Sequence, residues 1–263
     1  MNLFLKELKF NRKALIIWSI AMIVLVAACI TKFDTLSQMG SSISDVFNGL
    51  PKIAKAIFGI GNYDIMSICG YYCMIYYYLV ITIAIHAIIL GAGILSKEQK
   101  DRTSEFLMAK PMSRNKIITM KLFAALFNIL VVNIVTTVSV IALNSHPADL
   151  SNNLIIGTMA AALLIQVVFL SIGLLISVLT KKEKGAGSIA AMVIFIMFFI
   201  AKFIEMVDNT DFLKFLTPFK YFEADQVFFG NGFQGIYFVI SAVIIVVALA
   251  ITYVMYNKRD LTV

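Results

Sequence analysis

Six long apolar runs divide the sequence, and shorter polar segments separate them. Each run is long enough to cross a lipid bilayer as a helix, which takes about 17 to 25 mostly apolar residues. The pattern predicts an all-α integral membrane protein in which residues 1–263 form one transmembrane domain. The predicted spans are residues 14–30, 71–95, 117–143, 154–179, 185–204 and 233–256.

The composition excludes a water-soluble protein. Hydrophobic residues make up 60% of the chain and charged residues 14%, and the mean hydropathy is +0.91. A soluble domain is about one quarter charged and about half apolar. A single water-soluble core of this length would not bury so much apolar sequence, and membrane lipid is therefore the expected surrounding.

The positions of the basic residues predict the orientation in the membrane. With the N-terminus inside, fifteen Lys and Arg residues fall in the inside segments and five in the outside segments. Cytoplasmic loops carry an excess of these residues, which predicts that both termini are cytoplasmic. The formal charge of +7 is then a topology signal, and no nucleic-acid partner is expected.

Two segments beside the spans are expected to lie in the membrane interface. Residues 2–13 place apolar positions against basic ones, which predicts a short amphipathic helix in the inner interface. A simple basic anchor without a helix is the alternative. Residues 31–68 predict one or two helices along the outer leaflet, where Pro51 starts a turn and Gly59 and Gly61 end it.

The segment of residues 205–232 is expected to form a short hairpin that dips into the outer interface. Its apolar stripe consists of Phe212, Phe215, Leu216, Phe219 and Phe222. Its carboxylates are Glu205, Asp208, Asp211, Glu223 and Asp225. Solvated surface charge is the expected role of these carboxylates, and cation binding is the alternative.

The motifs of common enzymes are missing from the sequence. None of the 14 glycines precedes a lysine, so the phosphate-binding loop GxxxxGK[ST] is absent. No HExxH or GxSxG motif occurs, and the three cysteines have no metal-ligand spacing. We therefore expect neither an enzyme nor a metal or cofactor site. The pairs Gly157/Ala161 and Gly173/Ser177 instead predict close helix packing.

Some polar residues lie within the predicted spans, where contact with lipid is costly. Those taken as candidates for a substrate path are Tyr78, Thr82, His86, Asn133 and Gln166. Interhelical hydrogen bonding is the alternative role. The spans have no central Asp or Glu to receive a proton from His86, which disfavours proton-coupled transport.

A basic polar segment, Lys97 to Lys121, separates the second and third spans. Its basic residues before the third span are Lys97, Lys100, Arg102, Lys110, Arg114 and Lys116. Asp101 or Thr103 is a suitable helix cap, and Pro111 prevents extension of that helix. Apolar residues in this charged loop indicate insertion into a partner's groove. An ordinary orienting loop with a short interfacial helix is the alternative.

This loop resembles the first cytoplasmic loop of type-2 ABC exporter permeases, which are membrane subunits that pair with a separate ATPase. In that family the loop typically reads E, a few residues, G-T-x-E-x-L-L, then P-[VIM]-S-R and a later Lys. The residues that match are Thr103, Glu105, Leu107, Pro111, Ser113, Arg114 and Lys121. Arg102 stands where glycine is usual. The subgroup that the chain resembles most is the permeases of bacitracin-resistance and lantibiotic-immunity systems.

The resemblance implies a coupling helix at about residues 101–110 that docks on a cytoplasmic ABC ATPase. The implied coupling residues are Glu98, Asp101, Arg102, Thr103, Glu105, Phe106, Leu107, Met108, Lys110, Pro111 and Arg114. Two permeases, identical or related, would join two ATPases that hold ATP and Mg. The implied role is export of an amphipathic substrate, such as an antimicrobial peptide, a lipid-like molecule or a hydrophobic drug, across a bacterial cytoplasmic membrane.

Two other classes of membrane protein are alternatives to this reading. A stand-alone secondary transporter or channel should show inverted repeats or broken central helices, and the sequence shows neither. A membrane assembly protein without transport activity is favoured if the loop after Lys97 serves only to orient the chain.

Overall fold

A computed structural model describes residues 3–38, 46–47, 49–61, 63–100, 113–180 and 185–258. Six helices in this part of the chain are long and apolar enough to cross a membrane, which confirms the predicted number. They are α1 (Leu3–Ile30), α5 (Ile68–Lys100), α7 (Arg114–Leu143), α8 (Asn152–Leu179), α9 (Ala186–Met206) and α11 (Gly235–Lys258). The described residues contain no strand, so the all-α class is confirmed as well.

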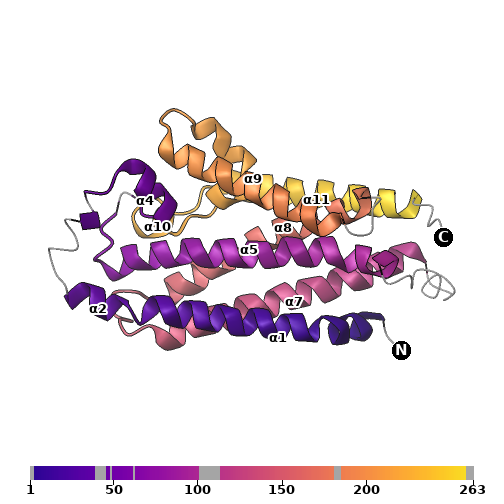
Figure 1. Cartoon of the computed structure of the whole chain (residues 1–263), viewed down its shortest axis with the longest axis horizontal. Coiled ribbons are helices and arrows are strands. Elements are labelled where there is room, and N and C mark those ends of the chain that lie inside the picture. Colours follow the sequence, from indigo (N-terminus) through magenta and orange to yellow (C-terminus); the bar gives the residue numbers. More distant parts are fainter. Residues whose placement is uncertain are drawn as a thin grey trace.

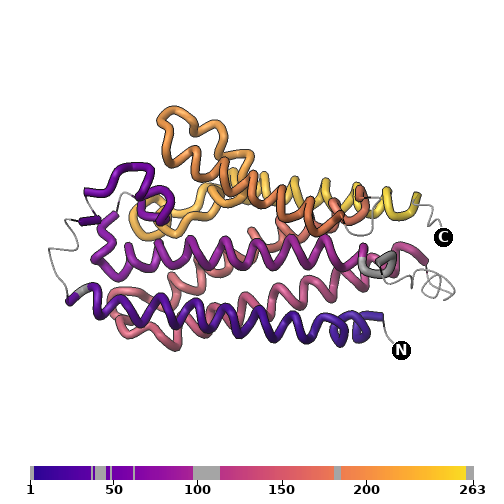
Figure 2. Tube along the Cα trace, in the orientation of Figure 1, coloured from indigo at the N-terminus to yellow at the C-terminus, as the bar shows by residue number. Residues whose placement is uncertain are grey.

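The main helices lie alongside one another as a bundle (Figure 1). Both chain termini lie at one end of the bundle, where α7 also begins, and we call this the terminal end (Figure 2). The opposite end carries the short helices α2 (Phe33–Gln38), α4 (Lys52–Phe58) and α10 (Ala224–Phe228). An even number of spans returns the chain to the end at which it started.

Helix α1 differs most from its predicted span because it already begins at Leu3. Residues 3–13 are helical as predicted, but no break separates them from the span that follows. Leu3 is buried beside Ile117 of α7, and Glu7 is buried as well. Contacts with α7 therefore hold the first turns of α1, which helical periodicity alone did not show.

Helices α5 and α8 form the centre of the bundle and are its most buried spans. Their backbones meet at Gly91 and Gly173. A methyl group added to Gly91 would collide with the carbonyl oxygen of Leu170, and one added to Gly173 with that of Ile88. The predicted close packing is confirmed at Gly173, whereas Gly157 faces open space and makes no such contact.

The two segments at the opposite end contain short helices. Helix α4 follows Pro51 and ends at Gly59, whose φ of 70° is a left-handed conformation that favours glycine. The second segment contains the 3₁₀ helices η1 (Asp211–Leu216) and η2 (Pro218–Lys220), followed by α10. Its predicted apolar stripe divides into two parts. Phe219 and Phe222 are buried in the bundle core, whereas Phe212, Phe215 and Leu216 of η1 are exposed.

Candidate functional site

Most of the predicted coupling residues lie outside the described residues: Asp101, Arg102, Thr103, Glu105, Phe106, Leu107, Met108, Lys110 and Pro111. Glu98 lies in the last turn of α5. Arg114 is the first residue of α7, and the Ser113 hydroxyl caps this helix by accepting a hydrogen bond from the Lys116 N–H. The helices on both sides of the predicted coupling segment are thus defined.

Arg114 joins the start of α7 to the end of α11. Its guanidinium donates to the carbonyl oxygen of Asn257 at 2.9 Å and to that of Tyr256 at 3.5 Å. The Asn257 side-chain amide in turn donates to the side-chain oxygen of Asn115 at 2.6 Å. A cation is favourable at a helix C-terminus, where carbonyl groups lack partners within the helix.

A buried charged group joins three helices close to the terminal end. The Lys121 ammonium of α7 is fully buried and donates to the carbonyl oxygen of Ile94 in α5 at 2.6 Å. It also lies 3.4 Å from the carboxylate of Glu7 in α1. A buried charge needs such partners, because its desolvation is costly. The sequence placed Lys121 near the end of a span but did not identify these contacts.

The five candidate residues for a substrate path have different surroundings in the described structure. The Tyr78 hydroxyl donates to the carbonyl oxygen of Phe58 at 3.0 Å, and that of Thr82 to the Tyr78 carbonyl oxygen at 2.9 Å. The Asn133 amide donates to the carbonyl oxygen of Met159 at 3.1 Å. These contacts are hydrogen bonds within or between helices.

The other two candidates are buried side chains. The His86 ring lies 5.1 Å from that of Trp18, and its Nδ1 has no hydrogen-bond partner among the described residues. Gln166 is fully buried in α8, and neither polar atom of its amide has a partner in the described part of the chain. None of the five candidates lines the pocket that lies at the opposite end.

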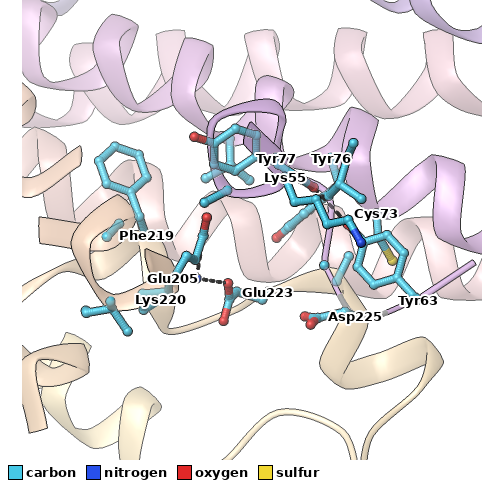
Figure 3. Close-up of a pocket in the computed structure, with 18 of the residues that line it drawn as sticks. Lys55, Tyr63, Cys73, Tyr76, Tyr77, Glu205, Phe219, Lys220, Glu223 and Asp225 are labelled. Atoms are coloured by element: carbon cyan, nitrogen blue, oxygen red, sulfur yellow. Dashed lines mark hydrogen bonds and ion pairs between the residues drawn. The ribbon is translucent and has the colours of Figure 1, made fainter. Parts of the chain in front are cut away.

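This pocket has a volume of about 340 Å³ and lies between α4, α5, α9 and the segment that contains η1, η2 and α10. Figure 3 shows Tyr63, Cys73 and Asp225 on one side of it and Glu205, Phe219 and Lys220 on the other. The pocket therefore combines aromatic walls with charged groups.

A chain of ion pairs runs along one side of this pocket. The Lys220 ammonium is 2.6 Å from the Glu205 carboxylate and 2.5 Å from that of Glu223. Lys202 contacts the second oxygen of Glu205 at 2.6 Å and donates to the Ala56 carbonyl oxygen at 2.8 Å. The cluster therefore links α9, the segment after it, and α4.

These contacts correct part of the prediction for the carboxylates. Glu205 and Glu223 are partly buried in ion pairs, so solvated surface charge was wrong for them. It is confirmed for Asp208 and Asp211, whose side chains are 87% and 82% exposed and pair with lysines at the surface. In the sequence, the i,i+3 spacings of Lys202/Glu205 and Lys220/Glu223 were the feature that could have indicated these ion pairs.

Burial controls the protonation of the groups in this segment. Desolvation raises the pKa of Glu223, although the nearby Lys220 opposes this shift. Desolvation likewise raises the pKa of Asp225, again against Lys220. Burial alone would lower the pKa of Lys220, but the attraction of Glu223 and Glu205 outweighs it and the net shift is upward.

Asp225 differs from the other two carboxylates of the cluster. Its Oδ1 is buried and has no hydrogen-bond partner among the described residues. Both lysines of the cluster direct their ammonium groups to Glu205 or Glu223. The side of the pocket at Asp225 therefore has an acceptor that no described side chain satisfies.

Comparison with known proteins gives a family match that covers almost the whole chain. A family model described as an ABC-2 family transporter protein matches residues 1–261. No curated protein matches the sequence. The match includes all six spanning helices and the basic segment between α5 and α7.

Proposed function

Because the chain belongs to the ABC-2 transporter family, we propose that it is the permease subunit of an ATP-driven exporter. The family match over residues 1–261 is the observation that carries this proposal. The chain is a multi-pass membrane protein with six spanning helices, as such a subunit requires. The proposed substrate is amphipathic, as for the permeases of bacitracin-resistance and lantibiotic-immunity systems, and the proposed location is the bacterial cytoplasmic membrane.

The energy for transport would come from a separate cytoplasmic ATPase that binds ATP and Mg. The sequence has no phosphate-binding loop of its own. The segment of residues 101–112 is the proposed docking point, and positive charge around it supports a cytoplasmic location of the terminal end.

The contacts beside this segment support its role in coupling. Lys121 joins α7 to α1 and α5, and Arg114 joins α7 to α11. A force on the segment between α5 and α7 would therefore act on four of the spanning helices together. Rigid-body motion of joined helices is a common form of switching between states.

A second permease subunit, either a copy of this chain or a related protein, would complete the transporter. Large apolar side chains are exposed along α9, including Phe195, Phe199 and Phe203. In a membrane such a face contacts either lipid or another transmembrane helix. The exposed face of α9 is therefore suited to contact with lipid or with a helix of the second permease subunit.

The proposal is tested by reversing one charge in the proposed docking segment. The tagged chain is purified from membranes together with its ATPase, and the Glu105→Lys variant is compared with Asp208→Lys. Both replace an acid by a lysine, and Asp208 is exposed at the opposite end. We expect Glu105→Lys to lose most of the bound ATPase and the transport activity, and Asp208→Lys to retain both. Full ATPase binding and transport in Glu105→Lys would contradict the coupling role.

A further inference from the structure

The pocket at the opposite end of the bundle has the composition of a ligand site. We propose that it binds an organic ammonium compound, whose cationic group pairs with Asp225 and whose apolar part packs against the tyrosines that line the pocket. This site is formed by one chain and does not depend on an ATPase. It would exist whether or not the proposed export function is correct.

The charge distribution in the pocket favours a cationic ligand at Asp225. Three lysines, Lys55, Lys202 and Lys220, lie around three carboxylates, those of Glu205, Glu223 and Asp225. Lys202 and Lys220 form ion pairs with the two glutamates. The Asp225 Oδ1 is left without a hydrogen bond from any described residue, although Lys55 also lines the pocket. A buried carboxylate oxygen without a donor is costly, and a ligand ammonium group would supply one.

Two further lysines that line the pocket pair with carboxylates other than Asp225. Lys214 pairs with Asp211 at 2.9 Å, and Lys52 pairs with Asp208 at 2.5 Å. Each of these surface lysines is balanced by its own carboxylate. Burial raises the pKa of Asp225, and the nearby Lys220 acts in the opposite direction.

The aromatic walls favour an organic cation. The Tyr63 ring is stacked on that of Phe229, with centroids 5.5 Å apart and planes inclined by 10°. The Tyr76 hydroxyl is held by the carbonyl oxygens of Phe222 and Thr158, at 3.0 and 3.1 Å. Rings fixed in this way offer flat apolar surfaces, and their faces attract cations. In Figure 3, Tyr63 lies beside Asp225 on the same side of the pocket.

The size of the pocket suits a small organic molecule. Its volume of about 340 Å³ lies at the lower end of the range for small-molecule sites, roughly 300 to 1,000 Å³. No group of three or more His, Cys, Asp or Glu side chains in the described part of the chain is arranged to hold a metal. A small amine with an aromatic or aliphatic body fits the observed lining better.

The test uses three probes of nearly the same shape and different charge. Phenethylamine is cationic, phenethyl alcohol is neutral and 3-phenylpropionate is anionic at neutral pH. Binding is measured by equilibrium dialysis against the purified full chain in nanodiscs, with empty nanodiscs as the correction for partition into lipid. We expect saturable binding of the amine, at least about tenfold tighter than that of either other probe.

Two variants then locate the binding site. Asp225→Asn keeps the shape of the side chain and should weaken binding of the amine by about tenfold or more. Asp149→Asn makes the same chemical change at an exposed carboxylate that does not line the pocket and should leave binding unchanged. Thermal unfolding of both variants shows whether they are folded. The ranking of the three probes on the unsubstituted chain tests the proposal without any variant.

Several outcomes would overturn the proposal. They are no saturable binding of the amine, equal binding of the amine and the alcohol, full binding by a folded Asp225→Asn variant, and displacement of the amine by Ca²⁺ at a stoichiometry of one ion per chain. No ATPase takes part in this assay. Its failure is therefore distinct from failure of the coupling experiment with Glu105→Lys.

Discussion

Lys220 pairs with two carboxylates in the ion-pair cluster at the opposite end of the bundle. Its ammonium lies between the carboxylates of Glu205 and Glu223, and its side chain is only 7% exposed. Together with Lys202, it connects η2 with α9 and with the loop before α10. Removal of a buried partner leaves the remaining charges desolvated and unpaired, which costs more than the pair itself contributes.

We expect Lys220→Met to lower the free energy of unfolding by about 2 to 3 kcal/mol, somewhat less than a fully buried pair because both glutamates are partly exposed. Lys214→Met is the matched control, since Lys214 pairs with the exposed Asp211, and its cost should stay below about 1 kcal/mol. Titration with SDS, followed by circular dichroism, measures both values. An equal loss in the two variants would show that the buried cluster contributes no more to the free energy of unfolding than the surface ion pair does.

The same variant predicts a pH dependence with a defined sign. Burial already raises the pKa of Glu223, and loss of Lys220 removes the group that opposes this shift. A carboxyl group whose folded-state pKa is raised binds its proton more tightly in the folded state, so stability increases as the pH falls. The destabilisation by Lys220→Met should therefore be smaller at mildly acidic pH than at mildly alkaline pH.

The sequence allowed only part of this cluster to be predicted. The pairs Lys202/Glu205 and Lys220/Glu223 are three residues apart. Helical geometry brings the first pair together within α9, whereas the second pair spans the turn between η2 and α10. The link between Lys220 and Glu205 depends instead on how η2 folds back against α9. Local periodicity does not contain that information, which is why the sequence predicted solvated surface groups for these carboxylates.

At the scale of elements, the spanning helices were predictable because their apolar length is a property of the sequence alone. The ends of these helices were less predictable, as α1 shows. Its first turns carry four basic residues, and contacts of Leu3, Phe4 and Glu7 with α7 explain why they continue the helix. The short helices of the opposite end were predicted where proline and glycine mark their limits, as at Pro51 and Gly59.

The contact between α5 and α8 gives a test at this scale. Gly91→Ala would place its new methyl group against the backbone of Leu170 and Leu174, which side-chain rotation does not relieve. We expect a loss of about 1 to 3 kcal/mol in the free energy of unfolding, typical of overpacking. SDS titration again provides the measurement.

Gly93→Ala is the control on the same helix, because a methyl group there meets no atom within 4 Å in the described structure. It should be neutral or slightly stabilising, since alanine favours helix over glycine. If Gly91→Ala were tolerated as well as Gly93→Ala, the close approach of the two helices would not be a requirement of the fold.

At the scale of the whole molecule, the even number of spans places both termini at the same end of the bundle (Figure 1). The distribution of Lys and Arg predicts that this end faces the cytoplasm. The coupling proposal requires that orientation, because an ATPase would have to reach the segment between α5 and α7. The amine site would then be open to the outside.

Single cysteines test this orientation. The three native cysteines are free and would first be replaced by alanine. Asp208→Cys, at the opposite end, should react with a membrane-impermeant maleimide in intact cells. Lys258→Cys, in the last turn of α11, should react only after the membrane is made permeable. The reverse pattern of labelling would contradict the predicted orientation and the coupling proposal with it.

The contact between Glu7 and Lys121 also constrains the order of events during biosynthesis. Glu7 leaves the ribosome well before Lys121, by several seconds at a synthesis rate of roughly 5–20 residues per second. Until α7 follows α1 into the membrane, the carboxylate of Glu7 lacks the lysine that neutralises it in the finished bundle. The first helix should therefore reach its final depth only when the third spanning helix inserts, and a chain arrested before Lys121 should keep α1 closer to the aqueous surface.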